Sequence, residues 1–329
     1  MGTEIVVISA LSQSGLEIDV VIPVFNGVRY LEEQIESIAN QTFPPTRLIL
    51  RDDGSTDGSL DLIFNLQKRY GDWLLVLPAG VNLGCIGNIN CLLSATSAPY
   101  VALADQDDVW IKDKLERSLD LLRSLESSYG AESPILVHSD LELINASGLR
   151  LGTTYFQRQH LHPRRVAPEE LVLSNVVTGC TLLCNRSLLR QALPIPKPAL
   201  MHDWWLALVA SVFGRLELLE GVTVRYRQHD SNVLGSQGLG AQYWWRRFLF
   251  FLQAPSAGGH TRAALLQAKC FEVRYGRSLS RLPALMALPR RQRWLPLFTL
   301  FGQKQMSKHG PLRTLALWVL LLFLPAGAE

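Results

Sequence analysis

The sequence predicts an α/β protein with a mostly parallel central sheet flanked by helices. Short apolar runs typical of buried strands alternate with segments of helical periodicity over residues 18–127. Three of the expected strands end at polar clusters, and the carboxyl ends of parallel strands are where such sheets bind ligands. The 329 residues are 48% hydrophobic, which is enough for one large domain with additions or for two domains.

Each expected strand is a short apolar run bounded by turn-forming or charged residues. The first run ends at Asn26 and Gly27, a pair typical of turns, and the fourth begins after Pro99. The four strands are expected at 18–25, 47–51, 73–77 and 100–104. The helices have apolar positions three or four residues apart and are expected at 28–41, 59–70, 86–96 and 112–127.

The second half of the chain is less regular. Its expected elements are strands at 135–139, 178–183 and 221–227 and a helix at 201–212. Beyond Gly235 the sequence is helical, aromatic and basic. We therefore divide the chain into an N-terminal segment (1–17), a main domain (18–235) and a helical C-terminal extension (236–329).

The most informative stretch is Asp105-Gln106-Asp107-Asp108-Val109-Trp110, directly after the fourth expected strand. Three carboxylates within four residues repel one another unless a positive charge offsets them. Hard divalent cations take oxygen ligands, and Mg²⁺ usually binds one or two carboxylates together with substrate phosphates. The stretch therefore predicts a metal–diphosphate site. The structural alternative is a solvated acidic loop that caps the next helix.

A second polar cluster, Asp52-Asp53-Gly54-Ser55-Thr56-Asp57-Gly58, follows the second expected strand. These residue types also form ordinary turns. A carboxylate at a strand end can instead accept the N3–H of a pyrimidine base, which predicts nucleotide recognition. The chain contains neither a GxGxxG fingerprint nor a Walker A loop.

The helix expected at 201–212 begins with His202-Asp203-Trp204-Trp205. A carboxylate at a helix N-terminus stays ionised at neutral pH and can take a proton from a hydroxyl as that hydroxyl attacks. Asp203 is thus a candidate general base, beside an aromatic residue that could stack on a sugar. The alternative is a capping aspartate followed by two core tryptophans.

A basic strand near the end of the main domain carries Arg225 and Arg227 and is followed by His229. Alternate positions of a strand face the same way, so both arginines could neutralise a leaving diphosphate. Neutral His229 could complete a metal shell, although a structural histidine is the alternative.

Together these motifs resemble the inverting GT-A glycosyltransferases of family two over roughly residues 18–235. The forms Asp-Gln-Asp-Asp-x-Trp and Tyr226-Arg227-Gln228-His229-x-Ser231-Asn232 look most like the rhamnosyltransferase-like members, which act in bacterial O-antigen or cell-wall polysaccharide assembly. The motifs that carry the resemblance are Ile22-Pro23-Val24-Phe25-Asn26, Asp52–Asp57, Asp105–Trp110 and His202–Trp205.

On the donor side, the resemblance implies a role for each matching residue. Pro23, Phe25 and Asn26 would line the nucleotide pocket, and Asp53 would bind the base. Asp105 would approach the ribose.

On the reaction side, Asp107 and His229 would hold Mg²⁺ or Mn²⁺ on the diphosphate. Asp203 would be the catalytic base, with Trp110 and Trp204 on the acceptor side. The chain departs from many members at His202, where they have glutamate.

The implied function is inverting, metal-dependent transfer of a hexosyl group from a nucleotide-sugar to a hydroxyl of a growing, lipid-linked bacterial polysaccharide. The resemblance favours dTDP-rhamnose as donor, with a UDP-hexose as the alternative. A nucleotidyltransferase would need a triphosphate-binding loop, which the sequence lacks near Asn26. A non-catalytic nucleotide-sugar-binding protein is a further alternative.

The C-terminal extension differs in charge from the rest of the chain. Residues 240–329 hold 13 Lys/Arg and 2 Asp/Glu, a net charge of +11, whereas residues 1–239 carry −8. Basic, aromatic segments suit the surface of an anionic membrane, and the ten-residue apolar run 315–324 is too short to span one. We expect this extension to hold the enzyme at the cytoplasmic face of the cell membrane. The alternative is a soluble appendage or dimer interface; no nucleic-acid motif is present.

The five cysteines form no CxxC pair, and their number is odd. This favours free thiols in a reducing cytosol, and the N-terminus shows no signal-peptide pattern. The apolar neighbours of Cys180 and Cys184 favour buried core thiols.

Overall fold

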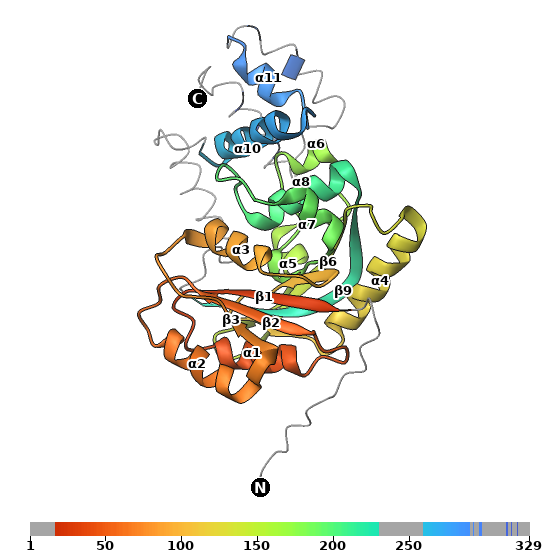
Figure 1. Ribbon diagram of the computed structural model, residues 1–329. Coiled ribbons are helices and arrows are strands. Elements are labelled where there is room, and N and C mark those ends of the chain that lie inside the picture. Colours follow the sequence, from red (N-terminus) through yellow and green to blue (C-terminus); the bar gives the residue numbers. More distant parts are fainter. Residues whose placement is uncertain are drawn as a thin grey trace.

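The computed structural model describes residues 17–229 and 259–289, together with residues 292, 296, 297, 314, 317 and 321. Their strands form one sheet of nine strands with helices on both faces (Figure 1). The α/β class predicted from the sequence is confirmed. The predicted N-terminal segment and residues 236–258 lie outside the described residues, apart from Glu17.

The first half of the sheet is parallel, with the strand order β3-β2-β1-β4. Every strand and helix expected here is present, with bounds shifted by a few residues. The elements are β1 (Ile18–Val24), α1 (Leu31–Ala39), β2 (Arg47–Asp52), α2 (Ser59–Tyr70), β3 (Leu74–Val76), α3 (Gly84–Ser94) and β4 (Tyr100–Leu103).

The second half continues the sheet as β8-β6-β9-β5, with β7 paired to β6. Its elements are β5 (Val109–Trp110), α4 (Lys114–Tyr129), β6 (Ile135–Asn145), β7 (Arg150–Thr154), α5 (Tyr155–Gln159), α6 (Pro168–Leu171), β8 (Leu183–Asn185), α7 (Arg186–Ala192), α8 (His202–Phe213) and β9 (Arg215–Gln228).

The sheet is mixed rather than mostly parallel. In the second half only β6 and β9 pair in parallel; β4 with β8, β6 with β8, β6 with β7 and β5 with β9 are antiparallel. The physical reason is visible at β6 and β7: they are joined by a short turn, whereas parallel neighbours need a crossover of a dozen or more residues.

The prediction of a strand at 178–183 is also wrong for most of these residues. Residues Gly179–Thr181 form a 3-10 turn, η2, before the short strand β8. Two hydrogen bonds to the carbonyl of Thr178 close this turn, one from the backbone N–H of Thr181 and one from its hydroxyl.

Two apolar cores lie on the two faces of the sheet. One packs α1, α2 and α4 against the strands, and the other packs α3, α6, α7 and α8. Helix α8 is buried over nine consecutive residues, His202 to Ala210, because it lies inside the second core rather than at its edge.

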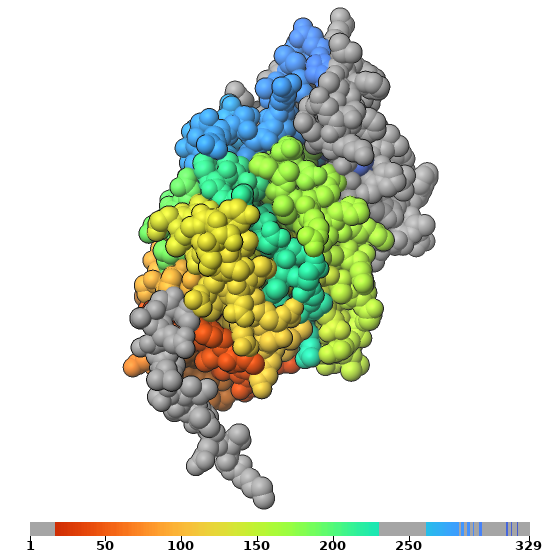
Figure 2. Space-filling view, turned by 90° about the vertical axis from the view of Figure 1, so that its right-hand side faces the viewer, coloured from red at the N-terminus to blue at the C-terminus, as the bar shows by residue number. Residues whose placement is uncertain are grey.

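The C-terminal helices α10 (Gly259–Tyr275) and α11 (Leu282–Ala287) confirm a helical extension, and α10 shares the second core. Phe271 contacts the rings of Trp205, Phe213 and Tyr275 at centroid distances of 5.5, 6.0 and 4.6 Å. Figure 2 shows the surface of these helices running on into that of the main domain below. None of the helices that the structure describes is long and apolar enough to cross a membrane.

Replacing Phe271 by alanine should lower the free energy of unfolding by about 3–5 kcal/mol, because the ring is fully buried in the core around α8. Chemical denaturation of the full chain measures this. Val273→Ala is the matched control on the same helix, since Val273 is 75% exposed. Equal stabilities of the two variants would contradict the packing of α10 on α8.

His138 on β6 is fully buried, and neither ring nitrogen has a hydrogen-bond partner among the described residues. Burial lowers its pKa to about 4, because the charged imidazolium has no water or carboxylate to stabilise it.

This depressed pKa predicts acid sensitivity. Below pH ~6.5 the unfolded chain binds a proton at His138 that the folded chain excludes, so stability falls by ~1.4 kcal/mol per pH unit until the pH nears the folded-state value. A His138→Leu variant should lose this slope between about pH 6.5 and 4, as measured by denaturation at a series of pH values. The exposed His162→Leu serves as control and should keep the wild-type slope.

Candidate active site

The loop after β1 is fastened to the acidic loop after β4. Gln106 Oε1 accepts from the backbone N–H of Phe25 at 2.9 Å, and Gln106 Nε2 donates to the carbonyl of Phe25 at 3.0 Å. A Cβ on Gly27 would clash with Gln106 Oε1, so a larger residue there would displace the Gln106 side chain from these bonds. Pro23 is half-buried in β1, and the Phe25 side chain is 49% exposed.

Asn26 joins the same loop to the cluster after β2. Its φ of +52° lies in the left-handed region, which asparagine tolerates better than most residues. Its Oδ1 accepts from Thr56 N at 2.9 Å, and its N–H donates to Ser55 Oγ at 2.8 Å. The structure thus brings the three predicted polar clusters to one edge of the sheet.

Asp53 is buried and held by the protein. Arg51 Nη1 donates to its Oδ1 at 2.6 Å, and Leu83 N donates to the same oxygen at 2.8 Å. Its Oδ2 accepts from Gly84 N, at the start of α3, at 2.9 Å. Asp53 therefore fixes the N-terminus of α3 as well as lying where the sequence expects nucleotide recognition.

The acidic loop concentrates negative charge in a poorly solvated place. Burial, with Asp107 and Asp203 nearby, raises the pKa of Asp105 to about 7. Asp108 is fully buried, and burial followed by the charges of Asp105 and Asp107 raises its pKa well above the usual range. Arg227 N donates to Asp108 Oδ1, whereas Asp108 Oδ2 has no hydrogen-bond partner among the described residues.

The two residues expected to bind metal contact each other: His229 Nε2 lies 2.8 Å from Asp107 Oδ2. The ring of His229 lies 5.2 Å from that of Tyr30, at the start of α1. Asp107 and His229 come from segments 122 residues apart, so only the fold brings them together.

Sequence reasoning missed the residues beneath the acidic loop. Ligand atoms of Asp105, Asp108 and Cys180 lie within 4.8 Å of one another, although Cys180 reads as a core thiol in the sequence. Lys114 is fully buried; its Nζ donates to Thr181 O at 3.0 Å and lies 4.4 Å from the Trp110 ring centroid. Burial lowers the pKa of Lys114 to about 7. The sequence carries no signal for either residue, because their positions depend on η2.

Asp203 lies in the first turn of α8 and is 8% exposed. Its Oδ2 accepts from Gly179 N at 3.0 Å, and its Oδ1 accepts from Trp204 N at 2.6 Å. Burial raises the pKa of Asp203, while these backbone bonds and His202 oppose the shift. Gly179 is followed in η2 by Cys180, which lies within 4.8 Å of Asp105, so the hydrogen bond to Gly179 places Asp203 beside the acidic loop.

The two arginines of β9, Arg225 and Arg227, differ in burial and in hydrogen bonding. Arg227 is 2% exposed and donates to Glu33 Oε2 at 2.6 Å, to Asp107 O at 2.9 Å and to Ala146 O at 3.3 Å. Its guanidinium is thus held against the acidic loop by bonds from all three of its nitrogen atoms. Arg225 is 39% exposed in its side chain, with Nε 3.9 Å from Glu142 Oε2.

Trp110 and Trp204, which the resemblance places on the acceptor side, both lie in the apolar cores. Trp110 is 3% exposed in the core with α1 and α4, and Trp204 is 5% exposed in the core with α8. Trp204 Nε1 donates to Leu171 O at 2.6 Å. Both rings are drawn inward because burying a large aromatic surface outweighs leaving it at the edge of a polar site.

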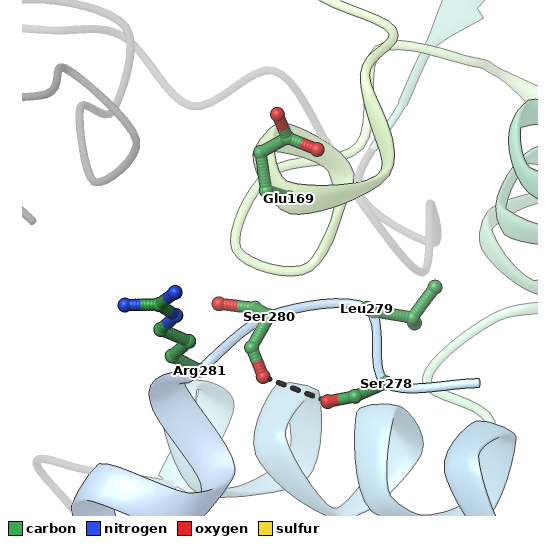
Figure 3. A pocket seen from close by; sticks show the side chains of 5 residues that line it. All are labelled: Glu169, Ser278, Leu279, Ser280 and Arg281. Carbon is green, nitrogen blue, oxygen red and sulfur yellow. Dashed lines mark hydrogen bonds between the residues drawn. The ribbon is translucent and has the colours of Figure 1, made fainter. Parts of the chain in front are cut away.

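The donor set fits a hard divalent cation. Asp105, Asp107 and Asp108 supply carboxylate oxygens, and the buried, unpartnered Oδ2 of Asp108 is an acceptor that lacks a donor among the described residues. A hollow elsewhere is unrelated to this site. It lies between Glu169 of α6 and the loop from Ser278 to Arg281, and contains none of the predicted site residues (Figure 3).

Residues 19–131 match the family model described as Glycosyl transferase family 2. This stretch of the chain is therefore similar to a family 2 glycosyl transferase domain. The matched range includes Asn26, Asp53, Asp105 and Asp107, whereas Asp203 lies beyond it.

Two curated glycosyltransferases are similar over more of the chain. TuaG of Bacillus subtilis (strain 168), assigned as a glycosyltransferase of teichuronic acid biosynthesis, is 26% identical over 235 residues, covering 69% of this chain and 85% of TuaG. The dTDP-rhamnosyl transferase RfbG of Shigella flexneri is 23% identical over 247 residues, covering 68% of this chain and 80% of RfbG.

The mannosyltransferase PcManGT from Pyrobaculum calidifontis, solved in complex with GDP-Man and Mn²⁺, has a similar fold. The TM-score is 0.52 at 16% identity, covering 92% of this chain and 78% of PcManGT. The GT-A fold predicted from the sequence is confirmed.

Proposed function

We propose that the protein catalyses inverting, metal-dependent transfer of a sugar from a nucleotide-sugar to a hydroxyl of a bacterial polysaccharide. The observation that carries this proposal is that Asp203 accepts a hydrogen bond from Gly179 N in η2, and the next residue of that turn, Cys180, lies within 4.8 Å of Asp105 in the acidic loop. A carboxylate base beside a cation-binding carboxylate pair is what this transfer needs.

Asp203 takes the proton of the acceptor hydroxyl as its oxygen attacks the anomeric carbon. The bond from that carbon to the diphosphate oxygen breaks on the opposite face, so the configuration inverts. A divalent cation held by Asp105 and Asp107, with His229, would supply Lewis-acid stabilisation of the leaving diphosphate. Arg225 adds positive charge, and Arg227 holds the backbone of Asp107 in place.

We propose dTDP-rhamnose as the donor, with a UDP-hexose as the alternative. Support comes from the sequence motifs and from the name of RfbG, a dTDP-rhamnosyl transferase that is 23% identical. Asp53 would recognise the base from the edge of the sheet with its Oδ2, which accepts one hydrogen bond, from Gly84 N, among the described residues.

A thermal-shift screen of nucleotide-sugars with and without Mn²⁺ tests the proposal. The donor should raise the melting temperature, and more strongly when metal is present, because a ligand stabilises the state that binds it. Product formation with that donor, followed by determination of the anomeric configuration, then tests inversion. No shift with any nucleotide-sugar would count against the proposed function.

We also propose a lipid-linked acceptor and peripheral binding at the cytoplasmic membrane face. The basic aromatic segments behind this proposal, 244–252 and 289–294, lie almost entirely outside the described residues, as does most of the apolar run 315–324. Since α10 belongs to the core, charge reversal in the full chain is a cleaner test than truncation. Replacing Arg246, Arg247, Arg290 and Arg291 by glutamate should weaken flotation with anionic liposomes, and unchanged flotation would contradict the proposal.

A further inference from the structure

We propose that Cys85 and His202 act as one pair that positions the catalytic base Asp203; this inference rests on the proposed function. Cys85 Sγ lies 3.6 Å from His202 Nδ1, a contact that joins the first turn of α3 to the first turn of α8.

Asp203 depends on its neighbours for its orientation. The side chain is held by backbone N–H groups of Gly179 and Trp204, so a shift between η2 and the start of α8 would break the bond to Gly179. The N-terminal turn of α8 has no side-chain cap of its own. Other contacts must therefore fix this turn.

His202 lies between η2 and the start of α3 and contacts both. Its side chain is buried, at 5% exposure. A Cβ on Gly179 would lie 2.7 Å from His202 Nε2, so the imidazole packs directly on the backbone that holds Asp203. One edge of the ring thus meets η2, and the other meets Cys85 on α3.

Cys85 also connects this region to the donor side. It follows Gly84, whose N–H, with that of Leu83, is bound by Asp53. Contacts therefore run from Asp53, through the start of α3 and the Cys85–His202 pair, to the turn that carries Asp203. Movement of α3 upon nucleotide binding would reach the base by this route.

The protonation states favour a thiol that donates to the imidazole. Partial desolvation of the thiol, followed by the charges of Asp105, Asp203 and Asp53, raises the pKa of Cys85 to about 11, although part of the residue reaches solvent. Burial also lowers the pKa of His202, which keeps its ring neutral. The S–H group can then donate to Nδ1 while Nε2 carries the ring proton.

Kinetics of four single variants of the pair, one control variant and one double variant test the inference. Cys85→Ala and His202→Leu should each lower kcat roughly 2- to 10-fold, the scale of one lost hydrogen bond, with the donor KM within about 2-fold. Cys85→Ser and His202→Asn keep a donor and an acceptor and should retain most of the rate. Cys91→Ala on the same helix is the matched control and should match the wild type.

The double variant Cys85→Ala/His202→Leu decides whether the residues act together. If they do, it should be no slower than the slower single variant, because the first substitution already removes the contact. Multiplied losses, or wild-type kcat in Cys85→Ala, would overturn the inference. Cys85 is exposed, so Cys85→Ala should fold even if His202→Leu does not, and melting temperatures check both.

The outcome is separable from that of the proposed function. If Asp203→Asn is nearly inactive while Cys85→Ala is fully active, only the positioning inference fails. If Asp203→Asn keeps the wild-type rate, the base assignment fails irrespective of the Cys85 variants.

Discussion

An Asp203→Asn variant should transfer sugar about 10²–10⁴ times more slowly than the wild type, the range for loss of a general base. The amide cannot take the proton of the attacking hydroxyl, although it has nearly the same shape as the carboxylate. The donor KM should change little, because Asp203 lies on the acceptor side of the reacting carbon in the proposed mechanism. Initial rates at saturating donor measure the effect.

The pH dependence gives a second measurement on the same variant. Because burial raises the pKa of Asp203, the wild-type kcat should fall at higher pH than an exposed aspartate would cause, as the base becomes protonated. Asp203→Asn should lack this acid limb. The exposed Asp72→Asn is the matched control, and a wild-type rate in Asp203→Asn would show that another group is the base.

An Asp107→Asn variant should lose the metal dependence of both activity and donor binding. Asp107 is the predicted metal ligand that meets His229 at 2.8 Å, and the amide oxygen carries no full charge. Loss of Lewis-acid stabilisation should raise the activation free energy by several kcal/mol, which lowers kcat by about 10²-fold or more. Mn²⁺ titrations of the rate and of the thermal shift given by the donor measure both effects.

The control for this change is Asp61→Asn, which replaces an exposed carboxylate on α2 by a carboxamide. It should keep the wild-type response to Mn²⁺. If Asp107→Asn retains the same half-saturating Mn²⁺ concentration as the wild type, Asp107 is not a metal ligand, and Asp105, Asp108 and Cys180 become the group to test next.

Local sequence patterns determined the first half of the fold. Each strand from β1 to β4 is a short apolar run followed by turn-forming residues, so periodicity alone located the parallel strands and the helices between them. For the same reason it placed Asn26, Asp53 and Asp105 at strand ends on one edge of the sheet, where the structure has them. The carboxyl ends of parallel strands lie at the same edge of a sheet, whatever the order of the strands in it.

Only the tertiary structure decided which of the predicted site side chains are exposed and which are buried. Arg225 and Arg227 are equivalent in the sequence, yet Arg227 is enclosed by Glu33 and the backbone of Asp107, which come from other elements. Trp204 likewise reads as a sugar-stacking residue until α8 is seen to be buried along most of its length. Packing between elements, not local preference, determines solvent exposure.

The structure also decided what surrounds the predicted base. Gly179, Cys85 and Lys114 carry no motif, and each matters only because of contacts between elements: η2 with α8, α3 with α8, and α4 with η2. A sequence records which groups can carry charge or bind a cation. The pKa of a buried carboxylate and the position of its hydrogen-bond donors depend on residues far apart along the chain, and those distances are set only by folding.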